Sequence, residues 1–203
     1  MGLSDLNAVY AKIARAAEGG DFVDVALREL GVEYAATDAD RARIPSKGPL
    51  IVVANHPFGA VEGLILLDLV RRARPDARAL ANRLLARIPE LRPLIFDVDV
   101  FGGEGAAASN RVALRRAIRW LRGGGALLAF PAGEVSHARP FQGAVDPPWN
   151  AGISDVVDGL VIVDLLESDT RTLARYLGRD GVRRLRAYHG AKAAVYARPT
   201  PIA

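Results

Sequence analysis

The feature that most constrains the fold is a pair of short, uninterrupted apolar segments, each followed at once by a polar loop. Residues 50–54 read Leu-Ile-Val-Val-Ala, and residues 125–130 read Gly-Ala-Leu-Leu-Ala-Phe. Apolar runs of this length without alternating polar residues are typical of strands that are buried on both faces. Pro57 and Gly59 end the first segment, and apolar residues return at helical spacing over residues 61–70. The order strand, loop and helix predicts a parallel sheet covered by helices.

Apolar periodicity and chain breakers place further elements along the sequence. The expected helices span residues 5–17, 21–30, 84–88, 109–121 and 170–188, with a capped helical turn at residues 37–43. The expected additional strands span residues 32–35, 77–81, 94–101 and 160–166. Strands that alternate with helices in this way are typical of an α/β fold with a mixed, mostly parallel sheet flanked by helices.

The length and composition fit one globular domain. The 203 residues are half apolar and one quarter charged, which is enough to build one buried core but not two full ones. We expect a single domain over residues 1–203. It would comprise an N-terminal helical part (1–44), an α/β core (45–150) and a C-terminal part (151–203).

Several classes of site and partner are disfavoured by composition. The chain has no cysteine and three histidines, so we expect no disulfide framework, no metal site and no resident cofactor. The net charge of +4 and the pI near 9.7 favour phospholipid headgroups, phosphate-bearing substrates or nucleic acid as partners. Nucleic acid ranks last, because the few aromatic residues are not interleaved with the basic ones.

No stretch approaches the roughly twenty apolar residues of a membrane-spanning helix. The first twenty residues carry both acidic and basic side chains and lack a long apolar core, so we expect no signal peptide. The two N-terminal helices are compatible either with packing against the core or with lying on a membrane. We therefore expect a cytoplasmic protein that is peripheral at the inner face of the cell membrane.

A histidine and a carboxylate follow the first strand. His56 and Glu62 are expected on the loop between this strand and its helix, at the sheet edge where α/β folds place their chemistry. A histidine beside a carboxylate can act as a general base that is held in one tautomer. The alternative is structural, with His56 ending a strand and Glu62 stabilising the first turn of a helix. Spacing alone does not decide between these two interpretations.

The second polar loop reads Phe-Pro-Ala-Gly-Glu-Val-Ser over residues 130–136. We expect it to lie at the same sheet edge as His56, because both loops follow parallel strands, and to lead into a helix. Backbone amides near Gly133 at the start of that helix would then bind an anion. The alternative is an ordinary Pro-Gly turn.

Together, the two motifs resemble a known family. The segment Asn-His-Pro-Phe-Gly-Ala-Val-Glu-Gly at residues 55–63, followed by the 130–136 motif, is similar to the PlsC-like lysophospholipid acyltransferases of the glycerolipid acyltransferase superfamily. The hemolysin-like, ornithine-lipid acyltransferase branch is the most similar. The resemblance covers roughly residues 22–150 and implies a PlsC-like acyltransferase fold. It also implies transfer of a fatty acyl group from acyl-CoA or acyl-carrier protein to the hydroxyl of a lysophospholipid or lyso-ornithine-type lipid.

The resemblance also implies roles for individual residues. His56 would be the general base that activates the acceptor hydroxyl, and Glu62 would orient it. The family's middle block often supplies an arginine for the acceptor phosphate, and Arg83 is preferred over Arg87 and Arg111 because it follows a predicted strand. The implied substrate-binding residues are Asn55, Gly59, Arg83, Phe130, Pro131, Gly133, Glu134 and Ser136.

The sequence departs from the family pattern at three places. The first motif reads His-x5-Glu, with Val61 where the family commonly has an aspartate. The second motif has Ala132 where a glutamate is usual, and no proline-containing fourth motif is found after Asn150. These departures leave three alternatives: a shortened or divergent active enzyme, an enzyme that needs a partner, or a non-catalytic homologue that binds lipids or membranes.

Overall fold

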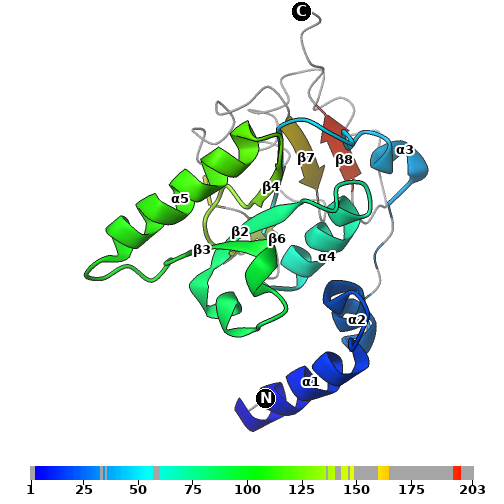
Figure 1. The fold of residues 1–203 in the computed structure, drawn as a ribbon, viewed down its shortest axis with the longest axis vertical. Coiled ribbons are helices and arrows are strands. Elements are labelled where there is room, and N and C mark those ends of the chain that lie inside the picture. Colours follow the sequence, from blue (N-terminus) through cyan, green and yellow to red (C-terminus); the bar gives the residue numbers. More distant parts are fainter. Residues whose placement is uncertain are drawn as a thin grey trace, which may run out of the picture.

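The computed structural model describes residues 3–32, 34, 36–56, 60–135, 137–139, 143–145, 147–148, 160–164 and 194–197 (Figure 1). Its helices are α1 (Leu3–Ala16), α2 (Phe22–Glu29), α3 (Asp38–Arg41), α4 (Ala60–Arg71) and α5 (Ala106–Arg122), with 3-10 helices η1 (Arg83–Arg87) and η2 (Arg92–Leu94). Its strands are β1 (Leu50–Ala54), β2 (Arg78–Asn82), β3 (Ile95–Val98), β4 (Ala126–Ala129), β5 (His137–Arg139), β6 (Gly143–Val145), β7 (Leu160–Asp164) and β8 (Ala194–Ala197).

The described strands form a mixed, mostly parallel sheet, as the sequence predicts. Six of them are ordered β3-β2-β4-β1-β7-β8, and each neighbouring pair is parallel except β7 and β8. Strands β5 and β6 form a separate antiparallel pair. The chain therefore has the α/β fold class expected from its alternating strands and helices.

Helices α4 and α5 cover opposite faces of the sheet. The connection from β1 through α4 to β2 and the connection from β3 through α5 to β4 run in opposite directions along the sheet. Because such crossovers are right-handed, the two helices lie on different faces. Alternate residues of β1 agree with this arrangement. Leu50, Val52 and Ala54 join the core cluster that contains Leu66 and Leu69 of α4, while the other two residues of β1 are buried outside it.

The N-terminal helices pack against the body of the protein. Asp21 caps helix α2, because its carboxylate accepts a hydrogen bond of 2.8 Å from the backbone N–H of Val23, and the helix packs on α4 (Figure 1). Ile13 of α1 is buried in the same core cluster as the apolar residues of α2. Of the two alternatives for the N-terminal helices, packing against the core or lying on a membrane, these residues show packing against the core.

Three local predictions need correction. The second motif does not lead into a helix, because residues 131–134 form a turn and a bend and the next described element is β5. No strand forms at Val32 or Tyr34, and the other two residues of the predicted 32–35 strand lie outside the described part. Strand β3 is shorter than the predicted 94–101 segment. The predicted strand at 160–166 is confirmed as β7, and the predicted helix at 170–188 lies outside the described residues.

Among the described residues, no helix combines the length and the apolar character needed to cross a membrane.

Candidate active site

The two sequence motifs meet at one edge of the sheet. Strands β1 and β4 are parallel neighbours in which Val53 lies opposite Ala129. The chain leaves both strands at the same edge, so Asn55 and His56 emerge beside Phe130. Asn55 is almost fully buried next to the end of β1. The prediction that both polar loops lie at one sheet edge is therefore confirmed for these residues.

His56 and Glu62 are in contact. The Nδ1 atom of His56 lies 3.0 Å from Oε1 of Glu62, whose side chain is 1% exposed, whereas the histidine side chain is 19% exposed. Glu62 does not lie on the loop, as predicted, but in the first turn of α4. Both proposed interpretations of Glu62 thus apply to one position, since the carboxylate contacts the imidazole and also lies at the positive end of a helix dipole.

Phe130 fixes the plane of the His56 imidazole. The two rings are stacked, with centroids 4.1 Å apart and planes inclined by 18°. Because Nδ1 faces the Glu62 carboxylate, Nε2 is the ring nitrogen that can take a proton from a hydroxyl group. The buried carboxylate and the aromatic ring therefore restrain the imidazole at its Nδ1 edge and on one face.

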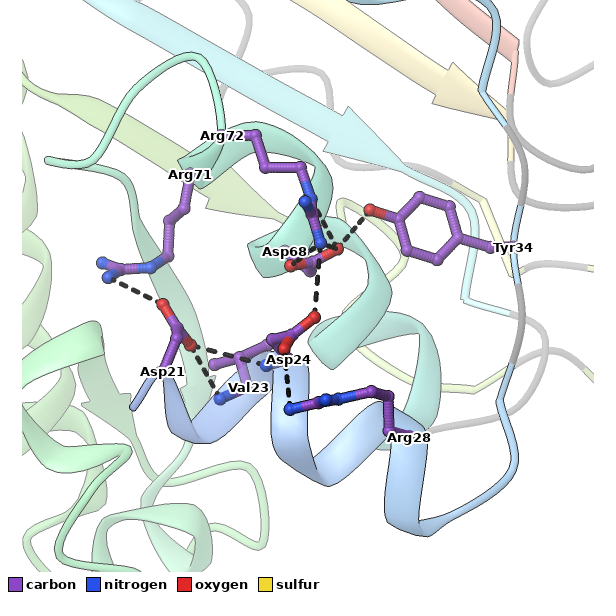
Figure 2. Close-up of polar contacts among 8 residues, drawn as sticks. All are labelled: Asp21, Val23, Asp24, Arg28, Tyr34, Asp68, Arg71 and Arg72. Atoms are coloured by element: carbon purple, nitrogen blue, oxygen red, sulfur yellow. Dashed lines mark hydrogen bonds and ion pairs between the residues drawn. The ribbon is translucent and has the colours of Figure 1, made fainter. Parts of the chain in front are cut away.

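Helix α4 is held in place at the end opposite Glu62 by a polar network with α2 and Tyr34 (Figure 2). The Tyr34 hydroxyl donates to Asp68, and Arg72 donates to both oxygens of Asp68 at 3.0 Å. Arg72 also reaches Asp24 of α2 at 3.4 Å. Burial, and then the hydrogen bond to Asp68, raise the pKa of Tyr34 to about 12. This network restrains the helix that carries Glu62.

The second motif forms a tight turn after β4. The carbonyl of Phe130 accepts a hydrogen bond of 3.0 Å from the N–H of Gly133, and Pro131 is buried between them. Gly133 has a φ angle of +75°, a conformation that favours glycine. Glu134, the next residue, is exposed. The predicted helix start at this loop is wrong, since residues 131–134 form a turn and a bend, and the Pro-Gly turn is the arrangement found.

Arg83 lies at the same edge of the sheet, where β2 ends. It pairs with Asp99, which follows β3, and its side chain is 57% exposed. The hydrogen bond from Arg83 holds the pKa of the Asp99 carboxyl below its usual value. Asn110 of α5 fixes the backbone of Asp99 by donating to its carbonyl and accepting from its N–H. Because β4 separates β2 from β1, Arg83 emerges two strands, or about 10 Å, from the strand that leads to His56.

Sequence reasoning missed the residues that position Arg83. Neither Asp99 nor Asn110 was predicted as part of the site. Apolar and acidic residues alternate over residues 96–100, and this pattern is the signal that a carboxylate follows β3. Gly59 and Ser136, two of the predicted binding residues, lie outside the described part of the chain. Within the described part, no cluster of three or more His, Asp or Glu side chains suits a metal ion.

Comparison with known proteins identifies the family. A family model described as acyltransferase matches residues 4–157, which include both motifs, the sheet edge just described and the N-terminal helices. No curated protein matches the chain. The match extends beyond residues 22–150, the range of the sequence resemblance, and covers most of the 203 residues. The chain belongs to the acyltransferase family, and it is an acyltransferase enzyme.

Proposed function

We propose that this acyltransferase moves a fatty acyl group from a thioester, acyl-CoA or acyl-carrier protein, to the hydroxyl of a lysophospholipid or lyso-ornithine-type lipid. The observation that carries the proposal is the contact between His56 and the buried Glu62, with the imidazole stacked on Phe130. The sequence contains no cysteine, so no thiol can act as the nucleophile. A histidine base without a thiol nucleophile favours direct attack by the acceptor's own hydroxyl.

In the proposed reaction, Nε2 of His56 accepts the hydroxyl proton as the oxygen bonds to the thioester carbonyl carbon. Glu62 stabilises the imidazolium that forms, as a carboxylate does beside a catalytic histidine. Collapse of the tetrahedral intermediate breaks the carbon–sulfur bond, and the departing thiolate takes the proton back from His56. The products are an ester and a free thiol. No further reactant is required.

Arg83 is the proposed contact for the acceptor phosphate. Its side chain is more than half exposed, and Asp99 pairs with its guanidinium at the end of β2. An arginine that is anchored by one carboxylate still presents N–H donors to a second anion. We further propose that Asn55, Pro131, Gly133 and Glu134 shape the walls around the acceptor, together with Gly59 and Ser136.

Apolar side chains at this sheet edge support a membrane surface as the place of action. Leu84 follows β2, Val100 and Phe101 follow β3, and Val135 follows β4, and all four are exposed, Phe101 by 72%. Arg83 and Arg87 flank Leu84. Exposed apolar residues among arginines suit the interface of an anionic bilayer. We therefore propose peripheral binding at the inner face of the cell membrane through the edge that bears His56.

Release of free thiol tests this function. Acyl-CoA and acyl-carrier protein are each supplied with a panel of lysolipids, and wild type is compared with His56→Ala and with a matched control, His189→Ala, outside the motifs. We expect release to depend on the acceptor, to fall about 10²-fold or more in His56→Ala, and to persist in the control. Full release by folded His56→Ala would overturn the proposal. No release with any pair would favour the alternative lipid-binding function.

A further inference from the structure

An open, basic cavity lies at the edge of the sheet opposite His56. It forms where β2 and β4 begin and where α5 ends, whereas His56 follows the end of β1. Strands advance by about 3.3 Å per residue, so about 13 Å of sheet separates the two edges. The cavity has a volume of about 390 Å³ and is bounded by the 123–125 turn. The side chains that line it are Asp76, Arg78, Phe96, Arg116, Arg119 and Trp120.

The cavity carries a net excess of positive charge. Asp76 is its acidic residue, and the buried Arg74 binds both oxygens of that carboxylate at 2.8 and 2.9 Å. The hydrogen bonds from Arg74 hold the pKa of Asp76 below its usual value. In the described part of the chain no ion pair joins Arg78, Arg116 or Arg119 to a carboxylate. Three guanidinium groups therefore face one cavity without compensating charge.

The walls of the cavity are fixed by packing. Trp120 donates a hydrogen bond of 3.2 Å from Nε1 to the carbonyl of Ala126. Its ring lies so close to Gly125 that a Cβ atom there would come within 2.3 Å of Nε1. The guanidinium of Arg78 lies over the Trp120 ring, 4.3 Å from its centroid, and 5.6 Å from that of Phe96. A guanidinium that lies over an aromatic ring still has N–H groups that can donate to a ligand.

The end of helix α5 does not account for this concentration of charge. Arg119 lies in the last turn of α5, where the helix dipole stabilises a positive charge, but Arg116 lies about one turn earlier. The carbonyls of Arg119, Trp120 and Leu121 already accept hydrogen bonds from the N–H groups of residues 123–125. Arg116 and Arg119 are three residues apart and share a side of the helix, so their like charges repel each other. An anion between them would remove this repulsion.

We propose that this cavity binds a phosphate group, at a site separate from the one that carries out acyl transfer. The paired N–H donors of a guanidinium bind two oxygens of a phosphate group. The cavity has three guanidinium groups and one carboxylate, that of Asp76, so positive charge remains for a ligand. The phosphate belongs either to a soluble molecule or to a lipid headgroup. The inference does not depend on His56, because the two sites lie at opposite edges of the sheet.

Fluorescence of Trp120 measures binding directly. The chain has two tryptophans, and Trp149→Phe leaves Trp120, whose ring lines the cavity, as the single tryptophan. Inorganic phosphate is titrated at constant ionic strength with chloride as the replaced anion. A second arm measures co-sedimentation with phosphatidylcholine vesicles with and without phosphatidic acid. Saturable binding of inorganic phosphate identifies a soluble ligand, and saturable binding only to the phosphatidic acid vesicles identifies a headgroup. Either result supports the proposal when replacement of the cavity arginines weakens it.

Charge-matched variants test whether the cavity is responsible. Arg116→Gln/Arg119→Gln removes two cavity arginines, while Arg115→Gln/Arg122→Gln removes two exposed arginines of the same helix that do not line it. We expect Kd to rise at least about tenfold in the first pair and to stay within about twofold in the second. Equal weakening in both pairs would overturn the proposal, because it would show diffuse surface attraction. Absence of saturable binding in both arms would overturn it as well.

Discussion

The imidazole of His56 lies nearly parallel to the phenyl ring of Phe130, with 4.1 Å between the ring centroids. The two residues are 74 positions apart, and parallel pairing of β1 with β4 brings them together. At its Nδ1 edge, the imidazole contacts the buried carboxylate of Glu62. The orientation of the histidine thus depends on a strand pairing, a helix start and a turn, and each can be changed separately.

Replacing Phe130 tests the role of the stack. Phe130→Leu removes the aromatic contact while keeping an apolar side chain, and we expect a loss of about 1 kcal/mol in unfolding free energy. Because the imidazole loses one of its two restraints, kcat for acyl transfer should also fall, whereas Phe130→Tyr, which can still stack, should keep it. Urea unfolding and steady-state kinetics measure the two effects. Unchanged kcat in Phe130→Leu would show that the stack does not orient His56.

Replacing Arg83 tests the proposed acceptor contact. In Arg83→Ala we expect KM for a phosphate-bearing lysolipid to rise about tenfold with little change in kcat, because one charge-assisted contact is lost. Arg87→Ala is the matched control, since Arg87 is also exposed on η1. Kinetics with both variants distinguish the two arginines. A larger effect in Arg87→Ala would transfer the role to that residue.

The network at the end of α4 predicts a loss of stability at high pH. Burial and the hydrogen bond to Asp68 raise the pKa of Tyr34 from 10.0 to about 12. The folded state therefore holds the tyrosine proton more tightly than the unfolded state, and this contribution is complete below about pH 10 and is lost as pH rises to about 12. Unfolding free energies measured across this interval should fall more steeply for wild type than for Tyr34→Phe. Equal slopes for the two proteins would contradict a raised pKa for Tyr34 in the folded state.

The position of the site could be predicted because it depends on local patterns. The apolar runs of β1 and β4 are uninterrupted, and each is followed by chain-breaking residues, so the strand ends are visible in the sequence. The place of Glu62 was harder to predict. Pro57 and Gly59 indicate a loop and the apolar spacing indicates a helix from residue 61, but the pattern does not decide to which of the two Glu62 belongs; the helix in fact begins at Ala60. The carboxylate therefore belongs to a helix rather than to the loop.

Contacts between distant elements could not be predicted. The pairing of Arg83 with Asp99 requires β2 and β3 to be neighbours, and the order of strands in a sheet is not encoded in local periodicity. The predicted helix after the second motif was wrong because the Pro-Gly turn leads instead to the β5–β6 pair. The basic cavity likewise depends on Arg78 of β2 meeting Trp120 of α5, residues that no local pattern joins.

A double-mutant cycle on His56 and Glu62 tests whether the two residues act as one unit in acyl transfer. Acceptor-dependent ester formation is measured by mass spectrometry for wild type, His56→Ala, Glu62→Gln and the double variant, after urea unfolding has shown that each is folded. We expect Glu62→Gln to lower kcat in the wild-type background and to add almost nothing once His56 is replaced. Independent, multiplying losses would contradict this expectation, as would full activity in His56→Ala.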